Sequence, residues 1–388
     1  MSSSEPRIPL AEPLIGGNAE AYLLECLRTN FVSSVGPFVT RFEEAFAAAV
    51  GSRFAVACSS GTAAIHLAMR VLEVGPGDEV LVPSMTFVAS VNPIAYVGAT
   101  PVLVDSEDAT YNMDPGLVVG ELERRARLGI RQPKAIELVH LLGHPADLGA
   151  VLETAERHGV AVIEDASEAL GAGYAIGTWA GRHVGSIGRV GCFSFNGNKL
   201  ITTGGGGMLV TDDEAIARRA RHLSTQARLP GAAYDHDDMG YNYRLTNVAA
   251  AMGLAQLEEL PSLLGARVVN AAAYDGALAS MPWLRPAPRA QWAAPSFWLY
   301  TAALADDLVE QEPDARRRVL EVLGGHAIEA RPVWTPLHRT RLWSAAPRLG
   351  GDVAERIFAK AFSLPSSSSL SDLQRARVIA ALREAAPA

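Results

Sequence analysis

The sequence predicts an α/β protein built on a mainly parallel sheet, with a second and smaller α/β unit at its C-terminal end. Short apolar runs alternate with amphipathic stretches from about residue 54 to residue 211, and the apolar runs lack a polar face. A proline-rich stretch, Met281 to Pro295, separates this region from further strand and helix patterns. Because strands without a polar face are covered on both sides, helices should sandwich the sheet.

The predicted strands of the large sheet are short apolar runs of β type. They are Phe54–Cys58, Glu79–Pro83, Pro101–Asp105, Ala135–His140, Val160–Asp165, Val190–Phe195 and Met208–Thr211. Amphipathic stretches between the early runs predict helices at Thr62–Leu72, Val88–Tyr96 and Leu148–His158. Only loops join the runs from Val190 onward, which indicates an antiparallel element near one edge of the sheet.

The second half of the chain predicts a helical region and then the small unit. Residues 212–280 have helical character, and Pro261 breaks or begins the long helix to about Ser280. Beyond the proline-rich stretch we expect strands at Phe297–Leu304 and Ile328–Val333, and helices at 313–323, 353–361 and 370–386. We therefore expect residues 1–30 to pack on the small domain, 31–265 to form the large domain, and 266–388 to form the small domain.

Composition excludes several classes of function. The chain has 388 residues, of which 49% are hydrophobic, and a net charge of −8, which argues against a nucleic-acid or anionic membrane surface. The N-terminus lacks the pattern of a secretory signal, and no run reaches the roughly 18 apolar residues that span a bilayer. Cys26, Cys58 and Cys192 are far apart and lack metal-ligand spacing. We therefore expect no metal site and a reducing, cytoplasmic compartment.

The first candidate site is Ser59-Ser60-Gly61-Thr62-Ala63, between a predicted strand and a predicted helix. A strand that runs into a glycine-containing turn and then a helix leaves several N–H groups pointing one way. These amides and the positive helix end suit a phosphate. A capped helix after a tight turn would have the same pattern, so this run alone leaves both interpretations open.

The second candidate is Asp165, in the run Val162-Ile163-Glu164-Asp165-Ala166 at the end of a buried-type strand. Ligands of open α/β sheets bind beyond the carboxyl ends of the strands. A carboxylate there can keep a pyridine nitrogen protonated, which makes the ring a better electron sink. A helix-capping aspartate is the alternative interpretation.

The third candidate is Lys199, which lies 34 residues beyond Asp165 in a polar loop before the run Gly204 to Gly207. Only Lys134, Lys199 and Lys360 are lysines among 34 basic residues, and a guanidinium cannot replace an amine as a nucleophile. Such a lysine could condense with an aldehyde, while the glycines allow backbone to approach a ligand closely. A solvated loop lysine is the alternative.

A phosphate cup, a ring-nitrogen acid and a Schiff-base lysine, in this order, are the layout of a large fold of pyridoxal-5′-phosphate (PLP) enzymes. From about Ile8 to Leu342 the chain resembles the DegT/DnrJ/EryC1/StrS family of sugar aminotransferases. The stretches that carry the resemblance are FVSSVGPFVTRFEEAFA, SSGTAAIHLAM, GDEVLVPSMTFVASVNPIAYVGATPVLVD, VIEDASEALGA, GCFSFNGNKLITTGGGGMLVTDD, GYNYRLTNVAAAMGLAQLE and IEARPVWTPLH.

The resemblance implies a PLP-dependent transferase of fold type I, with a mostly parallel seven-stranded sheet and a smaller C-terminal α/β domain. It implies transfer of an amino group from L-glutamate to C4 of a nucleotide-linked 4-keto-6-deoxy sugar, as in polysaccharide biosynthesis. The FSFNGNK and ARPVWTPLH versions further resemble the branch that acts on UDP-4-keto-6-deoxy-N-acetylhexosamines, on the route to bacillosamine and legionaminic-acid-type sugars.

Matching positions carry the family's cofactor site onto this chain. Lys199 would form the Schiff base with PLP and then act as the acid–base group, and Asp165 would pair with the pyridine nitrogen. The resemblance further implies that Gly61, Thr62, Ala63 and Ser194 hold the phosphate, that Phe87 stacks on the ring and that Glu168 contacts the ring hydroxyl or the sugar.

The resemblance also implies partners. Asn242 in GYNYR would reach the phosphate of the partner subunit, so we expect a homodimer with a shared active site. The candidates for binding the nucleotide sugar or the donor carboxylate are Glu168, Asn198, Arg331 and His338.

Two positions depart from the family pattern, and other functions stay open. Glu168 stands where glutamine or histidine is frequent, which could alter substrate choice, and Ser167 replaces a common alanine. Family members that are dehydratases commonly have histidine in place of the lysine, so Lys199 favours amino transfer. The alternatives are a C3 aminotransferase or dehydratase on another nucleotide sugar, and a PLP-binding regulator without activity. His140 and His144 have a structural role in our interpretation, because no third ligand has matching spacing.

Overall fold

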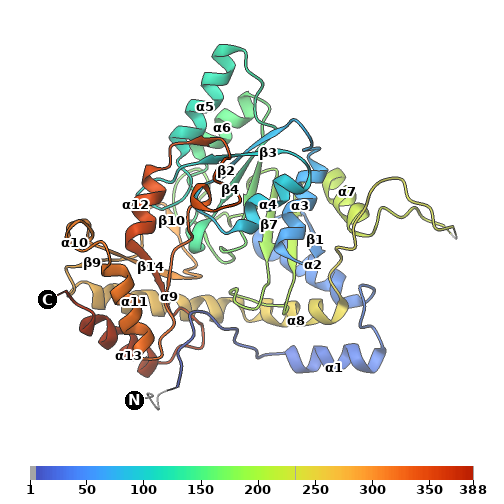
Figure 1. Ribbon diagram of the computed structural model, residues 1–388. Coiled ribbons are helices and arrows are strands. Elements are labelled where there is room, and N and C mark those ends of the chain that lie inside the picture. The colour runs from blue at the N-terminus through green and yellow to red at the C-terminus, as the bar shows by residue number, and fades with distance from the viewer. Residues whose placement is uncertain (1–5, 232, 388) are drawn as a thin grey trace.

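A large sheet runs through the middle of the molecule and a smaller sheet lies beside it, in the computed structural model of residues 6–231 and 233–387 (Figure 1). The large sheet has eight strands. In spatial order they are β1 (Phe54–Cys58), β8 (Gly207–Thr211), β7 (Val190–Ser194), β5 (Ala161–Asp165), β4 (Ala135–Val139), β2 (Glu79–Pro83), β3 (Thr100–Val104) and β13 (Arg348–Leu349).

Neighbouring strands from β7 to β13 are parallel, whereas β8 is antiparallel to both β1 and β7. This confirms the predicted mainly parallel sheet and its antiparallel element near one edge. The sheet has one strand more than the predicted seven, because β13 returns from the C-terminal part of the chain and pairs with β3. Two residues carry too little pattern to predict such a strand.

Helices cover both faces of the large sheet, as predicted. One face is covered by α3 (Gly61–Val71), α4 (Val88–Tyr96) and α7 (Glu214–Ser224), and the other by α2 (Pro37–Val50), α5 (Pro115–Leu128), α6 (Gly149–Arg157) and α8 (Asn247–Glu258). Alternate residues of β4 enter the two cores, because side chains of a strand point to opposite faces. The helix α1 (Ala19–Thr29) lies along α8.

The small unit is an antiparallel sheet covered by helices. Its strands are β12 (Arg331–Pro332), β14 (Ala361–Leu364), β11 (Tyr300–Leu304) and β9 (Leu284–Arg285), in that spatial order. Its helices are α9 (Leu260–Leu278), α10 (Asp306–Gln311), α11 (Ala315–Gly325), α12 (Asp352–Lys360) and α13 (Asp372–Glu384). Two short 3₁₀ helices, η1 (Leu141–Gly143) and η2 (Leu337–Arg339), and the pair β6 (Gly173–Tyr174) and β10 (Ala293–Ala294) complete the described elements.

Ile8 joins the core of the small unit and forms a β-bridge with Ile328. The start of the chain therefore touches the small unit, whereas α1 packs on the large one. The division into 1–30, 31–265 and 266–388 stays a proposal. None of the helices in the described part of the chain combines the length and the apolar character that crossing a bilayer requires.

Several stretches differ from the predicted elements, and of the strand predicted at Ile328–Val333 only β12 (Arg331–Pro332) is a strand. The predicted helical region 212–280 is interrupted, because the described residues between α7 and α8 form turns and isolated bridges (Figure 1). Pro230 and Gly231 follow α7 closely and oppose continuation of a helix there. The strand predicted from Phe297 begins at Tyr300, because Phe297 has a left-handed backbone with φ of 50°.

Asp105, just after β3, ties the large sheet to α12. Its carboxylate accepts hydrogen bonds from the N–H groups of Gly351, Val353 and Ala354, at 2.6, 3.1 and 2.8 Å. Asp105→Ala leaves these amides without their acceptor and should lower the free energy of unfolding by about 1–3 kcal/mol. Urea unfolding measures the change. Replacing the exposed Asp307 by alanine should cost no more than about 0.5 kcal/mol, and equal losses in both variants would contradict this account.

Candidate active site

The carboxyl ends of β4, β5 and β7 meet the start of α3 at a cavity of about 440 Å³. This is the edge of the sheet where the sequence predicted a ligand. Among the residues that line the cavity are nine predicted site residues: Gly61, Thr62, Phe87, Asp165, Glu168, Ser194, Asn198, Lys199 and Arg331. The fold therefore brings together side chains that lie up to 270 positions apart in the sequence (331 minus 61).

One end of the cavity is formed by the start of α3, where helix geometry leaves backbone N–H groups without intrahelical partners. Ser60 caps the helix, because its Oγ accepts the N–H of Ala63 at 3.0 Å. A Cβ on Gly61 would lie only 2.7 Å from Cβ of Ser194, so glycine allows the end of β7 to approach the helix start. The N–H of Ala63 already has a partner, and a phosphate contact from this residue stays a prediction.

Asp165 is the last residue of β5, and its side chain accepts two hydrogen bonds. Ser90 on α4 donates its hydroxyl to Oδ2 at 2.8 Å, and the N–H of Ser167 donates to Oδ1 at 3.0 Å. Thr86 shares a hydrogen bond of 2.8 Å with Ser90. Ser90 and Thr86 were not among the predicted site residues, although the stretch PSMTFVAS that contains them lies within one of the family-like segments.

Lys199 lies in the loop between β7 and β8, with its amine turned towards the cavity. Burial lowers the pKa of this amine from its ordinary value of 10.5, while the negative charges of Glu168 and Asp165 act in the opposite direction. Its Nζ lies 3.8 Å from the centroid of the Trp298 ring. More of this lysine is therefore uncharged near neutral pH than of a solvated lysine.

Glu168 is buried beside the amine. Its Oε2 accepts the N–H of Leu142 at 2.7 Å, and its Oε1 accepts the indole N–H of Trp334 at 3.2 Å. Burial raises the pKa of this carboxyl, and the charge of Lys199 opposes that effect. Trp334 also packs against Phe87, whose side chain is 49% exposed and therefore available to a ligand rather than lost in the core.

Three predicted site residues do not line this cavity. Ala63 is buried in the hydrophobic core between α3 and the large sheet. Asn242 lies in the segment after α7 and forms a β-bridge with Thr225. His338 is buried, with Nδ1 2.6 Å from Ser84 Oγ and Nε2 3.0 Å from Glu355 Oε1. Substrate binding by His338 stays a prediction, and the partners of both ring nitrogens give it a structural function at the end of β2.

Arg331 lines the cavity, but its ion-pair partner does not. Its guanidinium pairs with Glu329, which also pairs with Arg7 near the start of the chain. The Arg331 side chain is 68% exposed, so a ligand could compete with Glu329 for it at low cost.

The histidines near the site support the fold. Nε2 of His140 and Oε2 of Glu164 are 2.9 Å apart, both side chains are fully buried, and Glu164 also accepts N–H groups of the loop 185–188. His144 Nδ1 lies 2.7 Å from the carbonyl oxygen of Pro145. Within residues 6–231 and 233–387, no group of three or more histidine, cysteine, aspartate or glutamate side chains could hold a metal ion.

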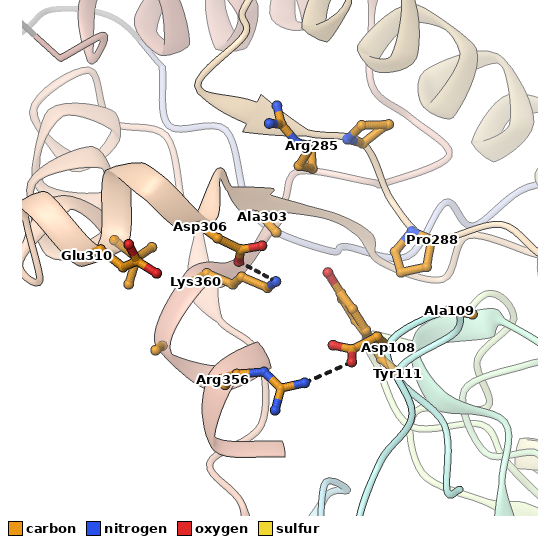
Figure 2. A pocket seen from close by; sticks show the side chains of 13 residues that line it. Asp108, Ala109, Tyr111, Arg285, Pro288, Ala303, Asp306, Glu310, Arg356 and Lys360 are labelled. Atoms are coloured by element: carbon orange, nitrogen blue, oxygen red, sulfur yellow. Dashed lines mark hydrogen bonds and ion pairs between the residues drawn. The ribbon is translucent and has the colours of Figure 1, made fainter. Parts of the chain in front are cut away.

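A second cavity of about 730 Å³ lies between the loop after β3 and the small unit (Figure 2). Its charged side chains are largely paired, because Arg356 contacts Asp108 at 2.8 Å and Lys360 contacts Asp306 at 2.7 Å. Neither Lys199 nor Asp165 lines it. Lys360, one of the three lysines, therefore serves as an ion-pair partner, unlike Lys199.

The chain is similar to known aminotransferases over nearly its whole length. The profile of the DegT/DnrJ/EryC1/StrS aminotransferase family matches residues 13–383. EpsN of Bacillus subtilis (strain 168), provisionally named a pyridoxal phosphate-dependent aminotransferase, is 41% identical over 380 residues, or 97% of this chain and 95% of EpsN. GDP-perosamine synthase of Caulobacter vibrioides (strain ATCC 19089 / CIP 103742 / CB 15) is 41% identical over 381 residues, or 98% of each chain. The crystal structure of S. venezuelae DesV in complex with a ketimine intermediate superposes with a TM-score of 0.86 at 32% identity, covering 99% of this chain and 100% of DesV.

The lowered pKa of Lys199 predicts its reactivity in the coenzyme-free chain. Because the neutral amine is the nucleophile, Lys199 should be acetylated with an apparent pKa below the ordinary 10.5. Competitive labelling with acetic anhydride across a range of pH, read by peptide mass spectrometry, gives this value. The lysine in a peptide copied from residues 194–204 is the matched control. An apparent pKa equal to that of the peptide would contradict the burial of the amine.

Proposed function

Because this chain belongs to the DegT/DnrJ/EryC1/StrS aminotransferase family of PLP-dependent sugar aminotransferases, we propose that it transfers an amino group from L-glutamate to C4 of a nucleotide-linked 4-keto-6-deoxy sugar. The observation that carries the proposal is the meeting of Lys199, Asp165 and the start of α3 at one cavity. An amine, a carboxylate and a helix start supply the three kinds of contact that this coenzyme needs.

The groups around the cavity are of the kinds that PLP requires. The close approach of Gly61 to Ser194 forms a cradle that a Cβ would fill, and the helix start beside it favours the phosphate. The half-exposed ring of Phe87 supplies a flat apolar surface for the pyridine ring. Asp165 lies on the same sheet edge as Lys199, so one ligand could reach both.

When bound, the coenzyme supplies the electron sink that stabilises charge at the substrate carbon. Asp165 would hold a proton on the pyridine nitrogen, and Ser90 would keep its Oδ2 in place. Lys199 Nζ would bind the aldehyde carbon and, once the donor amine has displaced it, move a proton between the substrate carbon and the coenzyme. Donor and acceptor would use one cavity in turn, so ping-pong kinetics should follow.

Glu168 is proposed to contact the substrate or the ring hydroxyl. Because burial raises the pKa of this carboxyl, it is protonated more readily than a solvated glutamate and could then donate a hydrogen bond. Its two present partners, the N–H groups of Leu142 and Trp334, fix its direction. Asn198 and Arg331 lie at the rim and are proposed to bind the polar groups of the nucleotide sugar or the donor carboxylate.

Two nucleotides are candidates for the acceptor substrate. The versions FSFNGNK and ARPVWTPLH favour UDP-4-keto-6-deoxy-N-acetylglucosamine, by their resemblance to the branch that acts on it. The relative named GDP-perosamine synthase, 41% identical over 98% of this chain, favours a GDP-linked keto sugar instead. We propose the UDP sugar as the substrate and the GDP sugar as the second candidate.

We also propose that the working unit is a homodimer. Apolar side chains are exposed in and after α1, among them Leu27, Phe31 and Val35, and such a group of apolar residues is typical of an interface. Asn242 does not line the cavity of its own subunit, so it is free to serve the phosphate site of a partner. This arrangement would complete the coenzyme site across the interface.

Lys199→Ala tests the central assignment. The variant should lose the absorbance band of the lysine–coenzyme adduct, and its turnover should fall by about a hundredfold to ten-thousandfold because proton transfer loses its acid–base group. Absorbance and a coupled assay for 2-oxoglutarate measure both effects. Lys360→Ala removes an amine from the second cavity and should keep band and turnover. A Lys199→Ala variant with full activity would refute the proposal.

The acceptor is identified by offering UDP-, GDP- and dTDP-linked 4-keto-6-deoxy sugars with L-glutamate. The largest kcat/KM should belong to the UDP sugar, and NMR should place the new amine at C4. An amine at C3 or a dehydrated product would favour the other enzymatic alternatives. A protein that binds the coenzyme but produces no 2-oxoglutarate from L-glutamate would instead be a regulator.

A further inference from the structure

Trp298 contacts the segment of Lys199 in two ways. The Nζ of Lys199 lies 3.8 Å from the centroid of the indole ring, and the indole N–H donates to the carbonyl oxygen of Asn198 at 2.7 Å. One side chain therefore holds both the end of the lysine and the backbone just before it. Trp298 lies 100 residues beyond Asn198 along the chain, on the path into the small unit.

The position of Trp298 is determined by the backbone around it. Its carbonyl oxygen accepts a hydrogen bond from the guanidinium of Arg267, and both side chains are almost fully buried. Phe297 just before it has a left-handed backbone, which non-glycine residues adopt at a cost. A Cβ on Gly143 would lie 2.7 Å from the backbone nitrogen of Trp298, so the close approach of the two segments requires glycine there.

We propose that Trp298 is a positioning residue whose ring provides the docking face for the Lys199 amine whenever that amine is not attached to the coenzyme. The inference rests on the proposed attachment of PLP to Lys199, and it concerns the part of the cycle in which the lysine is free. A free lysine has four rotatable bonds and would otherwise swing out of the cavity. Held against the ring, the amine stays inside the cavity that Asp165 and Glu168 also line.

The contact also sets the charge of the free amine. A cation over an indole face is stabilised by the ring, the more so where water is excluded. The charged groups that share the cavity with Lys199 are Asp165, Glu168 and Arg331. The two carboxylates favour the charged amine, burial disfavours it, and the ring adds to the side of the carboxylates. The indole ring of Trp298 thus favours the protonated amine, whereas burial alone favours the neutral amine.

The test measures attachment rather than turnover. The coenzyme-free, full-length chain is mixed with PLP over a range of pH, and the rate at which the adduct band grows is recorded. Nζ attacks the aldehyde carbon and the carbonyl oxygen leaves as water, so the midpoint of the pH–rate profile reports the loss of a proton from Lys199. Trp298→Leu removes the ring but keeps an apolar filling. Its midpoint should move to lower pH by about 0.4–1.5 units.

Matched variants distinguish a role of the Trp298 ring in positioning the Lys199 amine from a general role in packing. Trp298→Phe keeps a ring face and should restore most of the wild-type midpoint, whereas Trp283→Leu, a half-buried tryptophan of the small unit, should leave it unchanged. Thermal unfolding of each variant shows whether it is folded. If Trp298→Leu is not, Trp298→Met carries the same expectation with an unbranched side chain.

The outcomes distinguish this inference from the proposed function. A midpoint that stays in place in Trp298→Leu, or moves equally in the Phe and Leu variants, overturns the role of the ring. Lys199→Ala serves as the control for attachment. If that variant still develops the band, the assignment of Lys199 itself fails, and this inference fails with it. If it loses the band while Trp298→Leu keeps the wild-type midpoint, this inference fails alone.

Discussion

Burial lowers the pKa of the Lys199 amine, and two carboxylates next to it oppose the loss of its charge. Neither condition exists in a loop by itself. Burial requires Trp298 and Trp334 from the far end of the chain, and the carboxylates require the end of β5 and the turn that follows it. The amine is therefore tuned by three separate segments that only the folded sheet brings to one edge. The apolar strands and helices serve this arrangement, because they fix the strand ends to within the reach of a side chain.

Close backbone approach is the second constraint on the site. Gly61 and Gly207 both lie where a Cβ would collide, with Ser194 in one case and with the carbonyl oxygen of Ser60 in the other. The turn before α3 and the start of β8 thus lie close together, and the helix start lines the cavity. On the other side, the absence of a Cβ on Gly143 allows the segment that carries Trp298 to lie against η1. Steric room, rather than any single attraction, defines the shape of the cavity.

Patterns that repeat within a few residues were predictable from the sequence, and contacts between distant segments were not. The apolar runs gave β1, β2 and β5 nearly residue by residue, because a strand buried on both faces has no other composition. Their places at a strand end and in a glycine-rich loop made Asp165 and Lys199 candidates, the family resemblance gave them roles, and both line the cavity. Ser90, Trp298 and Trp334 went unnoticed, because a hydroxyl or an indole has no special pattern until its partner is known. The same limit applies to β13, whose two residues are a strand only because β3 lies beside them.

The scarcity of lysine has a chemical consequence for a protein that handles an aldehyde. Free aldehydes condense with exposed primary amines, and a surface rich in lysine would accumulate such adducts. Here 31 of the 34 basic residues are arginines (34 minus three lysines), whose guanidinium groups stay protonated. Of the remaining amines outside the cavity, Lys360 is occupied by Asp306 and Lys134 is half-buried. The chain thus offers an aldehyde few competing lysines.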